Sequence, residues 1–352
     1  MKIAILSPVA WRTPPVSYGP WEQIASNVTE GLVRRGLDVT LFATQNSITG
    51  AKLKAVCPHG YEEDHSLDAK VQECIHISML MEEARNFDII HNHFDFHPLT
   101  FSRLIRTPIV TTIHGFSSEH IVPVFKRYNR NTHYVSISES DRHPDLRYEA
   151  TVYNGIDPAQ FDFIGTPGEY LLFFGRLHPH KGAHDAIRIA QLSGKRLIIA
   201  GIIQNEQYFK EQVAPFIDGD QIQYVGTADP QQRRQLMGGA LALLHPIYFE
   251  EPFGLSVAEA MMCGTPVIAY NRGSMPELIK AGETGFIVSN AAEAAEAVKD
   301  IPSLDRGQCR AWSASKFSVD RMVDDYIEVY RSVLAKSPPK GPMTPSIMGR
   351  YN

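Results

Sequence analysis

Two carboxylates, Glu251 and Glu259, bracket the stretch with the clearest capacity for chemistry, with seven residues between them. Phe253, Gly254 and Leu255 lie where a helix is expected to begin, so one carboxylate belongs to a loop and the other to a helix. Glycine lets the backbone approach a ligand closely, and the free amides of the first helical turn attract an anionic group. An ionised carboxylate accepts hydrogen bonds from vicinal hydroxyls, as in a hexose or a ribose. A solvated helix face is the alternative interpretation.

A second cluster is cationic. Arg176 and Lys181 occur in FFGRLHPHKG, directly after a predicted strand and at the start of a predicted helix. Arginine offers a planar fork to phosphate oxygens, lysine adds a mobile point charge, and the helix amino terminus contributes partial positive charge. We therefore expect a pyrophosphate site, across an interdomain cleft from the two carboxylates. Surface cations paired with carboxylates would be the alternative.

Histidines form the third group. His114 ends an apolar strand segment and precedes a glycine, which makes it a site candidate. His91 and His93 belong to HNHFDFHP, where Asp95 and His97 would complete a possible metal site. Their spacing is typical of a strand end or loop and does not specify one tetrahedral site. A polar cleft wall or a turn is favoured over a metal, and we predict no metal ion.

Alternating strand and helix patterns must position these groups. They predict an α/β fold with parallel sheets, in which ligands bind beyond the carboxyl ends of the strands. Residues 46–66 receive no assignment, and the likeliest division between two halves is 154–168. Strands are expected at 2–7, 38–43, 87–90, 108–113, 133–137, 151–153, 170–174, 196–200, 222–225, 240–244 and 266–270. Helices are expected at 21–35, 67–84, 99–105, 181–192, 207–216, 230–237, 254–263 and 317–334.

Composition narrows the class of protein. A chain of 352 residues with a net charge of −5 is long enough for two domains, and neither half is basic. We therefore expect neither nucleic acid nor strong membrane association. The four cysteines form no CxxC pair, which favours reduced thiols in a cytoplasmic protein. No apolar run approaches the length of a membrane span.

Taken together, these residues resemble the retaining glycosyltransferases of family 4, which have the GT-B fold of two facing Rossmann-like domains with parallel sheets and an interdomain cleft. The resemblance extends from the first strand through TIHG, VYNGID and FFGRLHPHKG to EEPFGLSVAEAMMCGTPVIA and the helix that begins FSVDRMVDDY. Its carboxyl-terminal part is the most specific. The final helix resembles the family element that crosses back onto the amino-terminal domain.

The resemblance assigns roles to individual residues. It implies that Arg176 and Lys181 hold the donor diphosphate, that Glu251 contacts the transferred sugar, and that Glu259 binds the ribose. The segment 253–255 would lie against sugar and phosphate. His114 would lie beside the transferred sugar and Gly19 beside the phosphates, although many members have two adjacent glycines where this chain has Tyr18-Gly19-Pro20.

The implied activity is transfer of a hexose from a UDP- or GDP-sugar to a sugar-like hydroxyl acceptor, with retention and without a metal or other cofactor. Acceptor-side candidates are Trp11, Tyr18, His91 and His93. The expected domains are 1–160 with the returning helix 317–335, then 161–316, then a proline-rich tail at 337–352. A nucleotide-sugar epimerase, a phosphorylase-like enzyme or a noncatalytic nucleotide- or glycan-binding module are the alternatives.

Overall fold

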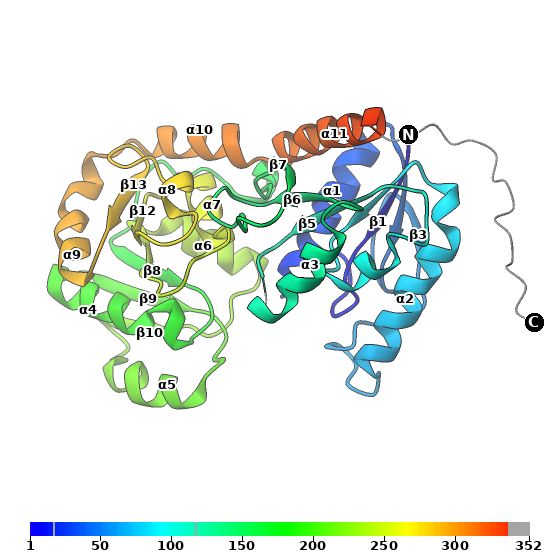
Figure 1. Cartoon of the computed structure of the whole chain (residues 1–352). Coiled ribbons are helices and arrows are strands. Elements are labelled where there is room, and N and C mark those ends of the chain that lie inside the picture. The colour runs from blue at the N-terminus through cyan, green and yellow to red at the C-terminus, as the bar shows by residue number, and fades with distance from the viewer. Residues whose placement is uncertain (17, 117, 337–352) are drawn as a thin grey trace, which may run out of the picture.

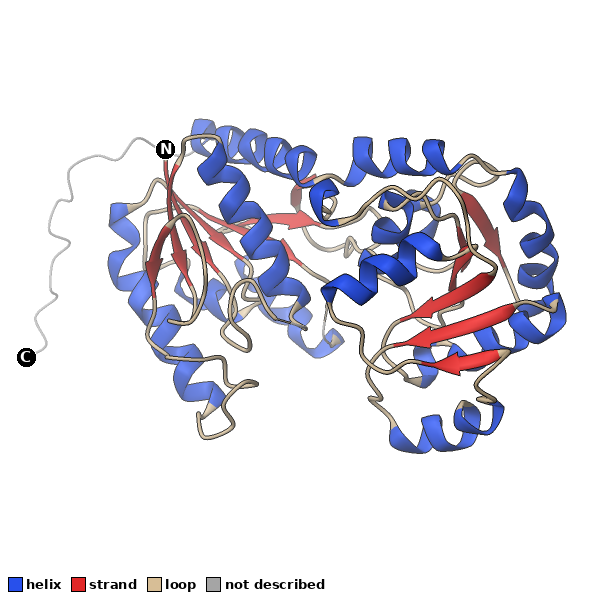
Figure 2. Ribbon diagram, turned by 180° about the vertical axis from the view of Figure 1, so that it is seen from behind, coloured by secondary structure: helices blue, strands red, loops and turns tan. Residues whose placement is uncertain are grey.

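Two parallel β-sheets, one from each half of the chain, organise the computed structural model (Figure 1). The structure describes residues 1–16, 18–116 and 118–336, so the predicted tail at 337–352 lies outside the described residues. Helices cover both faces of each sheet, as the view from behind also shows (Figure 2). This arrangement confirms the predicted α/β class with parallel sheets.

The first sheet has the strand order β3-β2-β1-β4-β5-β6-β7, and all its pairings are parallel. Its strands are β1 (Lys2–Leu6), β2 (Asp38–Phe42), β3 (Lys52–Lys54), β4 (Ile89–Asn92), β5 (Ile109–Ile113), β6 (His133–Ser136) and β7 (Tyr148–Thr151). The second sheet has the order β10-β9-β8-β11-β12-β13, again parallel. Its strands are β8 (Tyr170–Phe174), β9 (Arg196–Ala200), β10 (Ile222–Tyr224), β11 (Ala242–His245), β12 (Val267–Tyr270) and β13 (Gly285–Val288).

The helices fill the connections between strands. In the first half they are α1 (Pro20–Arg34), α2 (Ala69–Glu83) and α3 (Val122–Tyr128). The second half and the end of the chain contain α4 (Ala183–Ser193), α5 (Glu206–Gln212), α6 (Pro230–Gly239), α7 (Leu255–Met262), α8 (Met275–Leu278), α9 (Ala291–Asp300), α10 (Arg306–Phe317) and α11 (Val319–Lys336). In the described part of the chain, no helix is long and apolar enough to cross a membrane.

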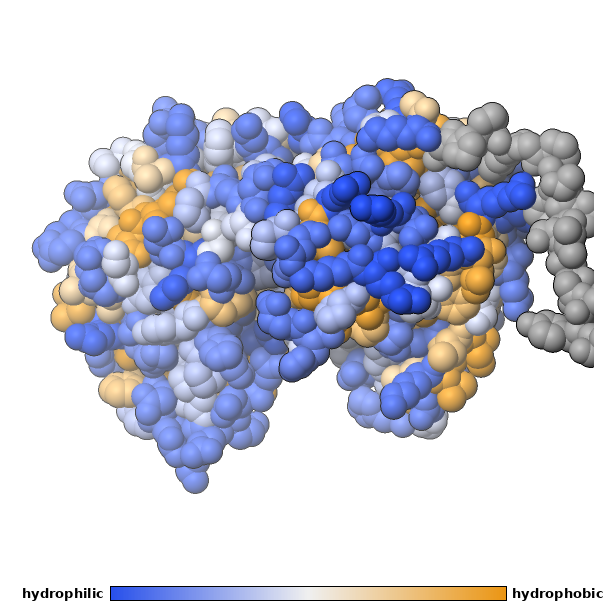
Figure 3. Space-filling view, viewed as in Figure 1, coloured by the Kyte–Doolittle hydropathy of each residue, from blue (hydrophilic) through white to orange (hydrophobic). Residues whose placement is uncertain are grey.

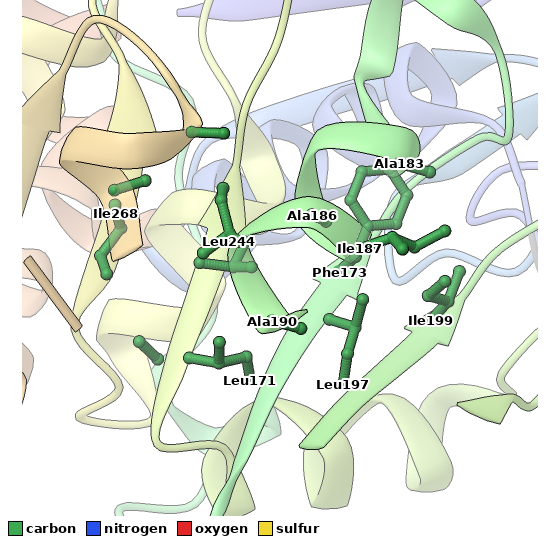
Figure 4. Packing of buried hydrophobic residues seen from close by; sticks show 14 of the residues in the cluster. Leu171, Phe173, Ala183, Ala186, Ile187, Ala190, Leu197, Ile199, Leu244 and Ile268 are labelled. Atoms are coloured by element: carbon green, nitrogen blue, oxygen red, sulfur yellow. The ribbon is translucent and has the colours of Figure 1, made fainter. Parts of the chain in front are cut away.

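Burial on both faces explains the continuous apolar strands. In β1, Ile3 and Ile5 join the core beneath α1 and α11, whereas Ala4 and Leu6 join the core beneath α2. In the second sheet, Leu171 and Phe173 of β8 pack against Ala186 and other residues of α4 (Figure 4). Side chains alternate between the two faces of a strand, so both faces must be apolar.

The last two helices belong to different halves. Helix α10 packs against α7 in the second half, whereas α11 packs against α1 in the first half, with the break between them at Ser318 (Figure 1). At this break the amide of Ile156 donates to the carbonyl of Phe317 at 2.7 Å, and the amide of Val319 donates to the carbonyl of Ile156 at 3.0 Å. The two passages of the chain between the halves therefore lie side by side.

Several expected elements differ from the structure. Strand β4 extends through His91 and Asn92, which were expected to follow the strand. Strand β7 begins three residues and ends two residues before its predicted position at 151–153. The helix expected at 99–105 is a short 3-10 helix at His97–Phe101. Strand β3 lies in the unassigned segment 46–66, and β13, α3, α8, α9 and α10 were not predicted.

All four cysteines are free, and three of them are buried. The surface is mostly hydrophilic in the space-filling view, and the lower outline is indented between the two halves (Figure 3). The loops that follow the carboxyl ends of several strands approach one another, as the contacts described next show.

Candidate functional site

Sheet topology indicates where a ligand should bind. In each sheet the strand order reverses direction between two central strands, β1 and β4 in the first and β8 and β11 in the second. The loops that leave such a pair diverge to opposite faces and open a crevice at the carboxyl edge. Lys181 follows β8 and Glu251 follows β11, so both belong to the crevice of the second sheet.

Lys181 and Glu251 form a buried ion pair in this crevice. Lys181 Nζ lies 2.6 Å from Glu251 Oε2, and the two side chains are only 16% and 14% exposed. His245, the last residue of β11, places Nε2 3.6 Å from the same oxygen. Burial alone would raise the pKa of Glu251, but His245 and Lys181 outweigh that effect and lower the pKa to about 2. The carboxyl group is therefore ionised at neutral pH.

The expectation that the cations face the carboxylates across the interdomain cleft is wrong. Lys181 contacts Glu251 directly because β8 and β11 are hydrogen-bonded neighbours in one sheet. Arg176 lies in the same β8 loop, where its Nη1 donates to Gln204 Oε1 at 2.9 Å. Cations and Glu251 thus occupy one edge of the second sheet.

Two helices begin at this edge with glycine. Gly182 precedes α4 with φ 74°, and Gly254 precedes α7 with φ 89°, and neither glycine provides a side-chain cap. In α4 the amide of His184 instead donates to the Tyr208 hydroxyl at 3.0 Å. A Cβ on Gly182 would lie 2.0 Å from the carbonyl oxygen of Pro246, so no other residue fits there. The carbonyl of Phe253 accepts a hydrogen bond from Ser274 Oγ at 2.7 Å, which fixes the loop before α7. The uncapped amino terminus of α7 leaves backbone amides available to an anion.

Glu259 lies deeper, on α7. Its side chain is 7% exposed and forms an ion pair with Arg233 of α6. Burial raises the pKa of Glu259, and the charge of Arg233 opposes that rise. The sequence indicated that a carboxylate at this position would need a partner, but it did not identify which residue supplies it.

The first sheet contributes the loop between β1 and α1. Gly19 is the residue before α1, with φ 143°, and a Cβ there would lie 2.9 Å from Pro15 Cβ. Glu22 is buried in the first turn of the helix, and burial raises its pKa to about 7. Its Oε1 accepts a hydrogen bond from the amide of Trp11 at 3.3 Å, while the Trp11 and Tyr18 rings meet edge to face with centroids 6.3 Å apart. Two of the acceptor-side candidates therefore adjoin one another.

His114 lies where the two halves meet. Its ring stacks on Trp21 with centroids 5.5 Å apart, and its Nε2 lies 2.9 Å from His93 Nδ1. Burial lowers the pKa of His114 to about 3, so the ring is neutral at physiological pH. The next residue, Gly115, has φ 102°, and a Cβ there would lie 2.7 Å from Pro252 Cγ. The loop carrying His114 thus contacts the loop carrying Glu251.

The structure does not support an acceptor role for His91. Its side chain is completely buried, with Nδ1 2.6 Å from the Tyr330 hydroxyl and Nε2 2.8 Å from Thr112 Oγ1. Both ring nitrogens are thereby used in joining β4 to β5 and α11. His93 is also fully buried, but its Nε2 lacks a hydrogen-bond partner among the described residues. No cluster of three or more metal-ligating side chains occurs in the described part of the chain.

Sequence reasoning missed two residues of this site. His245 was included only as the start of the carboxylate-rich stretch, and its position at the end of a central strand was the available signal. Arg233 is one of two adjacent arginines on a polar helix, and nothing in the sequence distinguishes it from its neighbour Arg234. Its contact with Glu259 joins elements that only the fold brings together.

Comparison with known proteins points to one group of enzymes. Residues 22–160 match the family model described as Glycosyltransferase Family 4, and residues 160–315 match the model described as Glycosyl transferases group 1. A curated relative, glycogen synthase from Mycobacterium tuberculosis, is 26% identical over 365 residues, which cover 86% of this chain and 88% of the synthase.

Solved structures agree in fold. AviGT4, a glycosyltransferase involved in avilamycin A biosynthesis, has a TM-score of 0.72 and 23% identity, covering 96% of this chain and 98% of its own. Anabaena HepE in complex with UDP-glucose has a TM-score of 0.71 and 21% identity, covering 94% of this chain and 100% of its own. These similarities confirm that the two parallel sheets form a GT-B fold.

Proposed function

The chain belongs to the family 4 glycosyltransferases, and we propose that it transfers a hexose from a nucleoside-diphosphate sugar to a hydroxyl acceptor, with retention and without a metal ion. The buried pair of Lys181 and Glu251 at the β8/β11 crevice carries this proposal. It places a cation, an ionised carboxylate and the amino termini of two helices at one edge of a sheet. A sugar diphosphate presents hydroxyls and negative charge in the same close arrangement.

Lys181 and Arg176 have the role of stabilising the leaving diphosphate. Negative charge accumulates on its oxygens as the bond to the anomeric carbon breaks, and fixed positive groups there lower the barrier. Arg176 donates to the neutral side chain of Gln204, and this contact leaves its charge available to phosphate. The uncapped amino terminus of α7 adds further positive potential. Together these groups would perform the task that a divalent metal performs in other transferases.

Glu251 and Glu259 have the role of gripping hydroxyl groups, Glu251 on the transferred sugar and Glu259 on the ribose. Glu251 is ionised but already engaged with Lys181, which makes it a poor candidate for an enzyme nucleophile. Retention is then best explained by attack of the acceptor on the same face as the departing phosphate, with that phosphate accepting the acceptor proton. The neutral ring of His114 lies beside this reaction and can donate or accept one hydrogen bond.

The acceptor should bind against the first sheet. Trp21 stacks on His114, and Trp11 and Tyr18 adjoin at the loop before α1. Flat aromatic faces beside hydrogen-bonding groups suit a sugar-like acceptor. UDP-glucose is the first donor to test, because the structural neighbour HepE was solved with it.

Calorimetric titration with UDP, GDP and ADP in the presence of EDTA tests both the nucleotide and the metal. We expect one nucleoside diphosphate to bind, and transfer from the corresponding sugar nucleotide to proceed with the chelator present. Activity that EDTA abolishes and magnesium or manganese restores would contradict the metal-free mechanism.

A Glu251→Gln variant tests the role of the carboxylate. Losing charged hydrogen bonds to a sugar hydroxyl should lower transfer about 10- to 100-fold with a smaller effect on nucleotide affinity. Transfer at the wild-type rate would contradict this assignment. Incubating the wild-type protein with a nucleotide sugar alone, or with a sugar phosphate, identifies an epimerase or a phosphorylase-like enzyme, and nucleotide binding without turnover would indicate a binding module.

A further inference from the structure

Arg233 and Glu259 form an ion pair that joins two helices beneath the carboxyl edge of the second sheet. Arg233 belongs to the first turn of α6, where Asp229 provides a capping box, and Glu259 belongs to α7. The arginine side chain is 32% exposed and the glutamate side chain 7% exposed. The pair therefore connects the deep carboxylate to a side chain that still reaches solvent.

Each partner keeps one polar atom without a hydrogen bond. Oε1 of Glu259 contacts Arg233, but Glu259 Oε2 is buried and has no hydrogen-bond partner among the described residues. Arg233 Nε is also buried and lacks a partner among them. Buried polar atoms in a folded protein are almost always satisfied, so these two atoms are available to a polar group from outside the protein, such as a ligand hydroxyl or water.

Aromatic rings fix the arginine in place. The guanidinium carbon of Arg233 lies 5.5 Å from the centre of the Phe174 ring and 5.9 Å from that of the Phe161 ring. A guanidinium against aromatic rings gains cation–π attraction and loses rotational freedom. Phe174 is the last residue of β8, two residues before Arg176, so the same strand that supports the pyrophosphate loop also supports Arg233.

We propose that Arg233 is a positioning residue for ribose recognition, which holds the Glu259 carboxylate so that its open oxygen accepts a hydrogen bond from a ribose hydroxyl. This inference depends on the proposed function, in which Glu259 binds the ribose. Arg233 has a second effect through charge, because burial raises the pKa of Glu259 and the arginine opposes that rise. Without the arginine, the buried carboxyl group would retain its proton at a higher pH and lose acceptor strength.

An alternative role for Arg233 is to block the ribose site until a ligand binds. If Arg233 merely occupied the ribose site in the absence of ligand, its removal would strengthen nucleotide binding because the ion pair would no longer have to be broken. The positioning role requires the reverse result. The two roles therefore predict changes in affinity of opposite sign.

The test uses Arg233→Met and Arg233→Lys, with Arg234→Met as a matched control from the same helix. Calorimetry measures, for each protein, the affinity for the tightest-binding of UDP, GDP and ADP and for its 2′-deoxy form. We expect wild type to prefer the ribonucleotide about 10- to 100-fold, the range of a hydrogen bond to a charged group. Arg233→Met should lose most of that preference, Arg233→Lys should recover part of it, and Arg234→Met should retain it.

Donor kinetics provide a second measurement. We expect Arg233→Met to raise the donor KM with a much smaller effect on kcat, because the ribose is remote from the bond that breaks. The ribonucleotide affinity of this variant should also fall from pH 6 to pH 5 more steeply than that of wild type. An unchanged preference for the ribonucleotide, or tighter binding by Arg233→Met, would overturn the inference.

A stability measurement separates this inference from the proposed function. When the pKa of a carboxyl group is higher in the folded protein than in the unfolded chain, the protein loses stability as pH rises above the unfolded pKa. The destabilisation caused by Arg233→Met should therefore grow from pH 5 to pH 8. In a Glu259→Gln background this growth should disappear, and its persistence would overturn the coupling. If wild type bound no nucleoside diphosphate, the proposed function and the ribose role of Arg233 would both be wrong. The unfolding measurements on Arg233→Met and Glu259→Gln would still show whether the two side chains interact.

Discussion

The charge state of Glu251 depends on its neighbours more than on its own chemistry. The side chain is 14% exposed, and burial alone would raise the pKa of this carboxyl group. Lys181 and His245 keep it ionised, so the site is ready to accept hydrogen bonds before any substrate arrives. A preformed acceptor requires little rearrangement when substrate binds.

Lys181→Met should destabilise the protein by about 3 kcal/mol at pH 7, because it leaves the buried Glu251 without its cation. The pKa of Glu251 lies near 2, below the unfolded value of 4.5, so the pair stabilises the fold above pH 4.5 and loses this contribution as pH falls toward 2. The difference between variant and wild type should therefore shrink below pH 4.5. Urea unfolding at pH 7 and pH 4 measures it.

Lys210→Met, which alters an exposed lysine on α5, supplies the control. It should change the free energy of unfolding by less than about 0.5 kcal/mol at either pH. An effect of Lys181→Met as small as that of the control would contradict the account of the buried pair.

His91 provides a second prediction about a single residue, because it is a buried group that is neutral in the folded protein, whereas Glu251 is ionised. Burial lowers its pKa to about 3 from 6.5, so the unfolded chain binds the proton more readily between these values. Stability that depends on neutral His91 is complete above pH 6.5 and falls by up to about 1.4 kcal/mol per pH unit below it. A His91→Gln variant should be less stable than wild type at pH 7 but show a shallower loss between pH 6.5 and pH 5 in urea unfolding. His65→Gln, at an exposed position, should follow the wild-type slope.

At the scale of elements, α4 and α7 depend on glycine where they begin. Gly254 adopts φ 89° at the start of α7, a conformation that a residue with a Cβ adopts at a cost of about 1–2 kcal/mol. A Cβ there would also lie 2.8 Å from the end of the Met275 side chain. Gly254→Ala should therefore lower the free energy of unfolding by about 1–2 kcal/mol. It should also weaken the binding of a nucleoside diphosphate, because it displaces the free amides of α7.

Gly194→Ala is the matched control for this change. Gly194 follows α4 with φ 64°, and a Cβ there meets no atom within 4 Å. This variant should lose similar stability and keep the nucleotide affinity of wild type, as thermal unfolding and calorimetry would show. Equal losses of affinity in both variants would indicate that α7 contributes nothing local to binding.

Whether a strand could be predicted from the sequence depended on how deeply it is buried. Central strands such as β1 and β8 are buried on both faces, so their continuous apolar runs are visible in the sequence. Strand β3, Lys52-Leu53-Lys54, is a short, largely exposed edge strand with two charged residues, and it leaves no such pattern.

At the site, Glu251, Lys181 and Gly254 were predictable from chain-local motifs. The contacts of Arg233 with Glu259, and of His91 with Tyr330, were not, because they join segments far apart in the sequence.

At the scale of the whole molecule, one side chain connects the two halves directly. Glu277 on α8 accepts hydrogen bonds from the backbone amides of Glu139 and Ser140 at 2.8 and 2.7 Å and from the Tyr153 hydroxyl at 3.0 Å. The first two donors follow β6 of the first sheet. This carboxylate therefore ties the second half to the first near the crevice.

Glu277→Ala should weaken that connection by about 2 kcal/mol, which favours arrangements in which the halves lie farther apart. Small-angle X-ray scattering without ligand should then give a larger radius of gyration than for wild type. Glu283→Ala removes a surface carboxylate that forms an ion pair with Lys280, and it should leave the scattering unchanged. Identical scattering from Glu277→Ala and wild type would contradict the role of this contact.

The paired passages of the chain at Ile156 and Ser318 restrict how the halves can move. A single linking segment would allow the two halves to rotate relative to each other in any direction. Two connections held together at neighbouring points define a line, and turning about any other direction would stretch one passage relative to the other. We therefore expect the backbone hydrogen bonds between them to favour swinging of the halves about this line over other relative motions.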